Sequence, residues 1–266
     1  MSELIYNNEW FKKRAFDSIK KISEGHWDYS DSLLLYLPSE LDTYEAIQSE
    51  NSPYYSIVTK PEREYLSSIA KDVATRLPHE FEFIDLGPGT EHKEQFLFDE
   101  LKALGKKFTY IPVDIKDEYL ELAKTHASTQ DIPVHPIQSS FEELASKLSK
   151  TNLPRFVSLG LTFSNYTPQE ILEMLKDIAG PAGFIFINSQ MRDRINMNEL
   201  QKAYSLDALH ITDEKLKLIG LDPEKDISPR ETTFDVKVWG TILKSNPLLE
   251  RISAQNTLGR DRLRSV

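Results

Sequence analysis

The sequence contains no cysteine among its 266 residues, which excludes disulfides, zinc–thiolate sites and thiol catalysis. That composition fits a reducing compartment, and we expect a cytoplasmic protein. The sequence also lacks an apolar run of the roughly 18 residues needed to cross a bilayer. Its first residues, Met1-Ser2-Glu3, do not begin the basic-then-apolar pattern of a secretory signal. We therefore expect no membrane association.

The sequence also lacks an excess of basic residues. Lys and Arg number 32 against 42 Asp and Glu, giving a formal net charge of -10. The field of such a protein repels phosphates, so we expect no nucleic-acid partner and a small-molecule substrate, cationic or zwitterionic. The six histidines are scattered without an i, i+4 pair, and we expect no metal site. The composition leaves the oligomeric state open.

The middle of the chain alternates short apolar β-rich segments with helical ones. The expected strands are Phe81–Leu86, Phe108–Val113, Val134–Gln138, Phe156–Leu159 and Gly183–Asn188. Capping boxes are expected at Thr59–Glu62 and Ser140–Glu143, and Thr167 is expected to cap the helix that follows it. After the first strand, we expect a helix with Leu97, Leu101 and Leu104 facing the sheet. The alternation predicts an α/β fold with a mostly parallel sheet and helices on both faces.

The flanking segments are less regular. Residues 1–60 are expected to form an N-terminal helical or cap segment, with a helix near Asn8–Ile22, and residues 61–250 to form the core. Within that core, residues of about 190–230 read as an insertion, including a helix near Met197–Leu209. A late strand is expected within Thr232–Leu243. The Arg-rich segment 251–266 reads as a polar tail.

A glycine turn directly follows the first expected strand. Asp85-Leu86 is followed by Gly87-Pro88-Gly89-Thr90, and two glycines let the backbone turn sharply and approach a ligand closely. Ligands of open parallel sheets bind at the carboxyl ends of the strands. Asp114 ends the second strand, where its carboxylate can accept the hydroxyls of a ribose. An ordinary strand-to-helix turn and a helix-capping Asp are the alternatives, but together the two features favour a nucleoside site.

The residues after the turn bear on which nucleotide binds. A dinucleotide fold prefers Gly-x-Gly-x-x-Gly and places a pyrophosphate at the helix N-terminus. Here His92 occupies the third glycine position and Glu91 precedes it. A bulky residue and an acid disfavour a diphosphate, whereas S-adenosylmethionine has no phosphate and carries a sulfonium. The sequence therefore favours S-adenosylmethionine as the cofactor over NAD.

Four segments in order resemble the histidine-specific methyltransferase family, which includes the histidine methyltransferase of the ergothioneine pathway. They are Asp85–Lys93, Pro53-Tyr54-Tyr55 with Thr59–Glu62 downstream, Leu159–Pro168, and Ala203-Tyr204. The resemblance covers about residues 30–210. It implies a Rossmann-like class I methyltransferase fold with a short substrate-side insertion, and methylation of a small molecule, most simply at the amine nitrogen of an amino acid or related amine.

The resemblance also implies roles for particular residues. Cofactor contacts are implied for the glycine turn (Gly87, Gly89) and for Lys93, Asp114, Ser140 and Phe141. Ser140 stands where the family has Asp and fits a helix cap equally well, while Phe141 fits adenine stacking or the core. Substrate contacts are implied for Tyr36, Tyr54, Asn165 and Tyr204, of which Asn165 and Tyr204 would position the nucleophile. The alternative role for the tyrosines is packing, which is the favoured interpretation for Tyr36. The alternative role for Asn165 is that of a turn residue.

The late strand departs from the family. Where the family has a Glu and a Ser that recognise imidazole, the best alignment places Thr233 and Asp235. A pocket with altered hydrogen-bonding groups loses its matched ligand by large factors, so histidine is not assigned as the substrate. Two other functions stay open: a catalytically inactive methyltransferase-fold binding protein, and an NAD(P)-dependent oxidoreductase.

Overall fold

The computed structural model describes residues 6–23, 26–28, 31, 33, 46, 48–90, 92–189, 196, 198–199, 217, 220, 222, 235–238 and 254–257. The chain divides into two compact units. One comprises Met1–Thr59 and Gln190–Val266, and the other comprises Lys60–Ser189.

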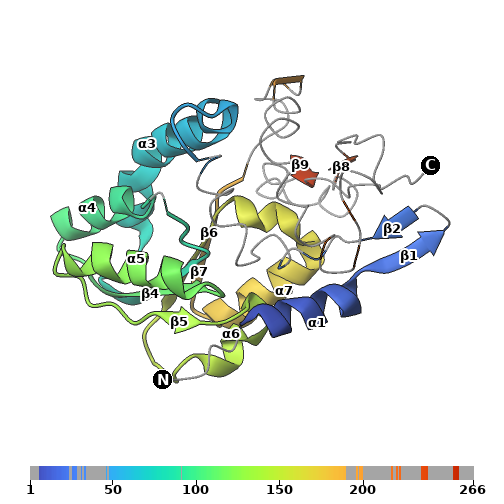
Figure 1. The fold of residues 1–266 in the computed structure, drawn as a ribbon. Helices are drawn as coiled ribbons and strands as arrows, with labels where there is room; N and C mark the ends of the chain where they lie inside the picture. The colour runs from blue at the N-terminus through green and yellow to red at the C-terminus, as the bar shows by residue number, and fades with distance from the viewer. Residues whose placement is uncertain are drawn as a thin grey trace. The chain divides into compact units, whose positions relative to one another are not determined.

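A five-stranded parallel sheet forms the centre of the second unit (Figure 1). Its strands are β3 (Glu80–Leu86), β4 (Lys107–Asp114), β5 (Ile137–Gln138), β6 (Arg155–Leu159) and β7 (Phe184–Ile187). They lie in the order β5-β4-β3-β6-β7 and every pairing is parallel. The chain runs from β3 outward to β5 and then returns to build β6 and β7 on the other side, which makes a Rossmann-like fold with a topological switch point beside β3. The expected parallel α/β fold is confirmed.

Helices cover both faces of this sheet. The helices of the unit are α3 (Lys60–Arg76), α4 (Gln95–Ala103), α5 (Asp117–Ser128), α6 (Phe141–Lys147), η4 (Leu161–Asn165) and α7 (Pro168–Ala179). One core packs α3, α4 and α5 against the sheet, and a second core packs α6 and α7 against the opposite face. Both faces of the central strands are therefore buried, as expected where helices cover a parallel sheet.

Aromatic rings fill the core beneath α3, α4 and α5. Phe83 is 1% exposed and its ring meets those of Phe98, Tyr110 and Phe156 at centroid distances of 5.9, 5.4 and 5.0 Å. The ring pairs are edge-on, the arrangement that the charge distribution of aromatic rings favours. This cluster fixes β3, the strand that carries the glycine turn, against α4.

Several local expectations are corrected. Leu104 does not face the sheet, because α4 ends at Ala103 and the Leu104 side chain is 41% exposed. Val134 forms only an isolated bridge to Tyr110, so β5 is shorter than expected. Ser140 is the N-cap of α6 but makes no side-chain cap hydrogen bond. The Thr167 cap is confirmed, since its side chain accepts from the Glu170 N–H in a full capping box.

The first unit contains shorter elements. These are α1 (Asn8–Ser18), β1 (Lys20–Ser23), β2 (His26–Asp28), the π-helix η3 (Tyr55–Thr59), β8 (Asp235–Val238) and β9 (Ala254–Thr257). The first helix ends before Ile22 because β1 pairs with β2 as an antiparallel ribbon. The described part of the late strand, β8, lies within the expected range and pairs with β9, which lies in the segment expected to be a polar tail. The helix expected near Met197–Leu209 falls almost entirely outside the described residues.

No helix within the described part of the chain combines the length and the apolar content that a membrane crossing requires.

Phe83→Ala should test the aromatic core. Truncating a fully buried Phe leaves a cavity and should lower the free energy of unfolding by about 3–5 kcal/mol, measured by urea denaturation. Phe184→Ala, at a side chain that is 39% exposed on the edge strand β7, is the matched control and should cost much less. Equal losses in the two variants would contradict the core described here.

Candidate functional site

The carboxyl end of β3 turns sharply through two glycines. Gly87 and Gly89 have φ angles of 70° and 65°, in the left-handed region that side chains disfavour. The Gly87 N–H donates to the Val113 carbonyl at 2.9 Å, which continues the β3–β4 ladder into the turn. A Cβ on Gly87 would lie 3.6 Å from Thr162 Oγ1 and 3.8 Å from Phe141 Cζ. The turn thus brings bare backbone up to residues from η4 and α6.

Asp114 lies at the end of β4, on the strand next to the turn. It is 7% exposed and its Oδ1 accepts the Lys116 N–H at 2.9 Å. Burial raises the pKa of Asp114 to about 7, although backbone N–H groups of Lys116 and Ile115 and the charge of Lys116 oppose the shift. A carboxylate in this position can accept hydrogen bonds from hydroxyl groups of a ligand that lies across the strand ends.

Phe141 and Ser140 follow β5 at the same edge of the sheet. Both are buried, and Phe141 contributes to the core that packs α6 and α7 against the sheet. The Phe141 ring also lies 6.1 Å from the ring of Tyr166, between centroids. Phe141 therefore packs in the core and at the same time lies beside the glycine turn.

A second carboxyl group lies inside β3 itself. Asp85 accepts a hydrogen bond from the Tyr110 hydroxyl at 2.8 Å. Desolvation raises the pKa of Asp85 to about 7, with a further contribution from Glu94, while the Tyr110 hydrogen bond and the Lys93 charge oppose it. In turn, burial and the Asp85 charge raise the pKa of Tyr110. The edge of the sheet is thus rich in carboxyl groups, and Lys93 is a cation among them.

Lys93 itself is held by an acidic residue from α3. Its Nζ donates to Glu62 Oε2 at 3.1 Å, and the Lys93 side chain is 22% exposed. Glu62 was expected to complete a capping box with Thr59. Instead, Thr59 Oγ1 donates to Gln48 Oε1 at 2.6 Å, and the Glu62 carboxylate pairs with Lys93.

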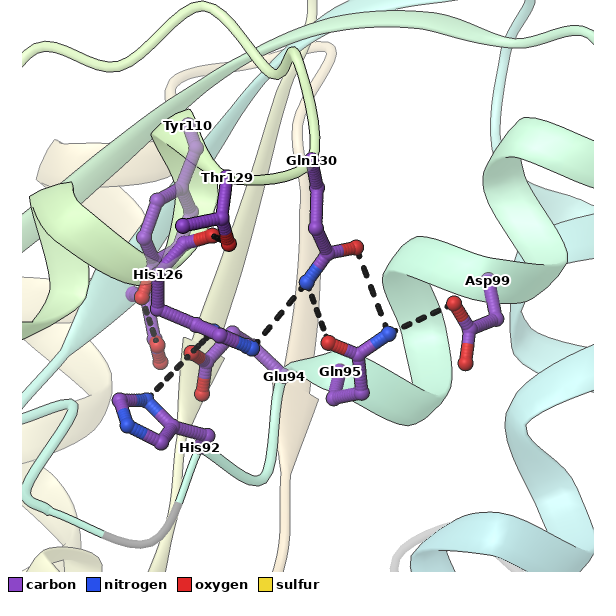
Figure 2. A network of polar contacts seen from close by, with 9 residues as sticks. His92, Glu94, Gln95, Asp99, Tyr110, His126, Thr129 and Gln130 are labelled. Carbon is purple, nitrogen blue, oxygen red and sulfur yellow. Dashed lines mark hydrogen bonds and ion pairs between the residues drawn. The ribbon is translucent and has the colours of Figure 1, made fainter.

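A polar network surrounds Glu94, the N-cap residue of α4 (Figure 2). Its Oε1 lies 2.9 Å from Nδ1 of His126 on α5 and 3.5 Å from Nδ1 of His92. The two imidazole rings pack with centroids 4.1 Å apart. Burial opposes ionisation of Glu94, but the bonds to His126 and His92 hold its pKa below the ordinary value. His92 has φ 49°, in the left-handed region that residues with a side chain rarely adopt.

A chain of amides orients His126 (Figure 2). Asp99 can only accept, so it takes the Gln95 side-chain N–H at 2.6 Å and turns the Gln95 oxygen toward the Gln130 amide nitrogen. That nitrogen also lies 3.1 Å from Nε2 of His126, which must therefore accept. The imidazole proton then resides on Nδ1 and points to Glu94.

His92, Glu94 and His126 also form a group that could hold a metal ion, with one ligand atom from each lying within 4.8 Å of the others. The scatter of histidines along the sequence gave no sign of it. A metal ion at Nδ1 of His126 would displace its proton and leave Nε2 as a donor facing the Gln130 amide nitrogen. The hydrogen-bond pattern thus favours a hydrogen-bond network over a metal ion at these three residues.

A family model described as histidine-specific methyltransferase, SAM-dependent, matches residues 31–225, which is most of the chain. The chain belongs to this family. The match includes the glycine turn, Lys93, Asp114 and the β6–η4 segment described above.

Two proteins similar in sequence to this chain are named as N-methyltransferases. The chain is 27% identical over 124 residues to a histidine N-alpha-methyltransferase of Mycobacterium tuberculosis, covering 46% of this chain and 38% of that one. It is 28% identical over 153 residues to the N-methyltransferase dtpB of Aspergillus flavus, covering 56% and 39%. The chain thus spans about two fifths of the length of these curated relatives.

Solved structures similar to the chain include methyltransferases. The plantazolicin methyltransferase BpumL, in complex with a monoazolic desmethylPZN analog and SAH, matches 85% of this chain and 82% of its own, with 14% identity and a TM-score of 0.41. An S-adenosylmethionine-dependent methyltransferase from Clostridium acetobutylicum matches 56% and 57%, with 16% identity and a TM-score of 0.37.

The structure describes all six of the predicted cofactor residues but fewer of the predicted substrate residues. Asn165 is half-buried at the end of η4, in the same unit as the glycine turn. Tyr54 is buried in the other unit. Tyr36, Tyr204 and Thr233 lie outside the described residues, as does the side chain of Asp235, whose backbone belongs to β8. The roles expected for these residues stay predictions.

Glu94→Gln should test the network around His126. The variant removes the charge that both imidazoles face, and we expect it to lower the free energy of unfolding by about 1–3 kcal/mol at neutral pH. Because the folded-state pKa of Glu94 is lowered, this stabilisation is present above the unfolded-state pKa and is lost as the pH falls through the folded-state pKa. The difference between wild type and variant should therefore shrink in acid.

Glu121→Gln is the matched control, since Glu121 pairs with Lys124 on the exposed face of α5. A surface pair of this kind contributes at most about 1 kcal/mol. Urea denaturation at several pH values measures both variants. If Glu94→Gln cost no more than Glu121→Gln, the network would not stabilise the fold.

Proposed function

We propose that this protein is an S-adenosylmethionine-dependent methyltransferase that transfers a methyl group to the amine nitrogen of an amino acid or a related small amine. The observation that carries the proposal is the meeting of the left-handed glycine turn with Asp114 at adjacent strand ends. Membership of the family and the names of the two relatives support the same chemistry.

The residues at the strand ends fit an adenosyl group. Gly87 and Gly89 would allow close approach of the nucleoside because no side chain intervenes. Asp114 would accept the ribose hydroxyls, and Phe141 with Ser140 would flank the adenine, since Phe141 lies beside the turn. Lys93 would meet the acidic end of the methionyl part. The Asp114 carboxylate is a hydrogen-bond acceptor for hydroxyl groups, and the Lys93 ammonium is a donor for a carboxylate.

The start of α4 argues against a dinucleotide. A pyrophosphate would bind at the N-terminus of the helix that follows the glycine turn. Glu94 is the N-cap of that helix and is buried there, and its pKa is held below the ordinary value, so a negative charge lies close to that place. Like charges would repel. This observation disfavours the NAD(P)-dependent oxidoreductase.

When bound, S-adenosylmethionine supplies a methyl group on a sulfonium, which is already an activated leaving group. The protein then has to bring the amine nitrogen into line with that methyl group and keep it deprotonated. Asn165, at the end of η4, would hold the amino or carboxylate group of the acceptor through its amide. Tyr54, Tyr204, Thr233 and Asp235 remain proposed substrate contacts, with Asp235 as a candidate proton acceptor.

Asp114→Ala should weaken binding of S-adenosylhomocysteine. Loss of a charged acceptor for two hydroxyls should reduce affinity about 10- to 100-fold, measured by titration calorimetry. Asp177→Ala, at an exposed position of α7, is the control and should bind like wild type. Unchanged affinity in Asp114→Ala would show that the ribose does not lie on this carboxylate.

The same interaction should depend on pH. The pKa of Asp114 is raised to about 7, so its acceptor form is lost as the pH falls through that value. We expect affinity for S-adenosylhomocysteine to be about tenfold weaker at pH 6 than at pH 8. Asp114→Asn should bind weakly at both values without this slope. A wild type and an Asn variant with equal slopes would contradict the assignment.

Asn165→Ala should impair handling of the methyl acceptor while sparing the cofactor. We expect kcat/KM for the acceptor to fall on the order of tenfold or more, with S-adenosylhomocysteine affinity unchanged. The assay is methyl transfer over a panel of amino acids and amines, with Asn152→Ala at an exposed position as the control. Normal turnover in Asn165→Ala would make this residue purely structural. Binding of S-adenosylhomocysteine without turnover of any acceptor would favour the inactive binding protein.

A further inference from the structure

Glu62 occupies an unusual position for a helix-surface glutamate. It lies in the first turn of α3, yet its side chain is only 7% exposed. Oε2 accepts from Lys93 Nζ at 3.1 Å and Oε1 accepts from Asn188 Nδ2 at 2.5 Å. Asn188 is itself buried. Three segments far apart in the sequence therefore meet at one carboxylate.

The carboxylate lies at the carboxyl edge of the sheet. A Cβ on Gly160, directly after β6, would be 3.8 Å from Glu62 Oε1. Asn188 directly follows β7, and its N–H donates to the Leu159 carbonyl at 2.9 Å. Lys93 belongs to the loop that follows the glycine turn of β3. Glu62 thus spans the ends of β3, β6 and β7, on the edge of the sheet that carries the proposed cofactor site.

Burial of this ion pair calls for an explanation beyond stability. Moving charges out of water is unfavourable, and the attraction between the two ions offsets that cost only in part, so a buried pair is weak evidence for stability. A pair of opposite charges at a ligand-binding edge is, however, complementary to a zwitterion. A carboxylate of the ligand would meet Lys93, and an ammonium of the ligand would meet Glu62.

We propose that Glu62 and Lys93 together form the subsite for the α-amino acid end of the methyl donor. Lys93 binds the donor's carboxylate, and Glu62, held by Asn188, accepts hydrogen bonds from its ammonium group. The mutual ion pair of Glu62 and Lys93 is exchanged for two pairs with the ligand. This inference rests on the proposed function, and it adds Glu62 and Asn188 to the site.

The donor, rather than the acceptor, is favoured by the continuity of the loop. Lys93 is six positions after Gly87 in the same turn-to-helix connection, and Gly87 is where the adenosyl group is proposed to lie. A ligand that places its nucleoside on the turn extends its amino acid end along this connection. An amino acid acceptor bound by Glu62 is the competing outcome of the test.

Two ligands separate the subsite from the rest of the cofactor site. S-adenosylhomocysteine carries the amino acid end, whereas 5′-methylthioadenosine shares the adenosyl part and lacks it. We expect wild type to bind S-adenosylhomocysteine more tightly than 5′-methylthioadenosine by titration calorimetry. Glu62→Gln should reduce that preference about 10-fold or more, since it removes a charge-assisted interaction, and should leave the affinity for 5′-methylthioadenosine unchanged. Lys93→Met should reduce the preference likewise.

Glu64→Gln is the matched control, because Glu64 is an exposed glutamate in the same helical turn. It should keep the wild-type preference. Thermal unfolding checks that each variant folds. If Glu62→Gln does not fold, Lys93→Met still tests whether the ion pair binds the donor's amino acid end.

Three results would overturn the proposal in distinguishable ways. An unchanged preference in a folded Glu62→Gln variant would show that Glu62 does not bind the donor's ammonium group, and an unchanged preference in Lys93→Met as well would show that neither residue binds the donor's amino acid end. The same result together with a raised KM for an amino acid acceptor would assign Glu62 to the acceptor. Failure of wild type to bind either nucleoside would refute the proposed function itself, and with it this subsite.

Discussion

The hydrogen bond from the Gly87 N–H to the Val113 carbonyl is the constraint on which the site depends. It extends the β3–β4 ladder by one residue beyond Leu86 and so fixes where the chain leaves the sheet. Because Gly87 and Gly89 then adopt left-handed φ angles, the backbone turns over the strand ends without a side chain in the way. Asp114 lies just beyond Val113, so the turn and the carboxylate are held in one register.

The surroundings of this turn explain why it stays in place. On the strand side, the ring cluster around Phe83 anchors β3 to α4. On the loop side, Glu94 receives His126, whose tautomer is fixed through Gln130, Gln95 and Asp99. Between these two anchors the loop carries Lys93 toward Glu62. The position of the one cation in this loop is thus determined from both ends of the connection between β3 and α4.

Much of the fold could be predicted from the sequence, because its signals are local. The strand-ending Asp85-Leu86 before the glycines, the Thr167 cap and the apolar spacing of α7 each act within a few residues. The spacing of Leu104 predicts a core position, but spacing does not show where a helix ends, and α4 ends one residue earlier. The strand expected at Val134–Gln138 exists but is shorter, because only Ile137 and Gln138 pair continuously with β4 and Val134 forms an isolated bridge.

Site residues could be predicted from the sequence only where their own segment of the chain shows their position. Gly87 and Lys93 follow β3 and Asp114 ends β4, and the order of strands places these strand ends at one edge. Glu62 read as a capping residue, because its partners Lys93 and Asn188 come from other segments and only tertiary packing brings them together. The same holds for His126 and Tyr110, whose partners Glu94 and Asp85 lie on neighbouring elements.

A crystal structure with S-adenosylhomocysteine tests the central claim most directly, since it locates the nucleoside and the amino acid end at once. The account predicts the ribose hydroxyls on Asp114, the nucleoside against Gly87, and the amino acid end between Lys93 and Glu62. A nucleoside bound elsewhere on the protein, with Asp114 and the glycine turn untouched, would contradict it.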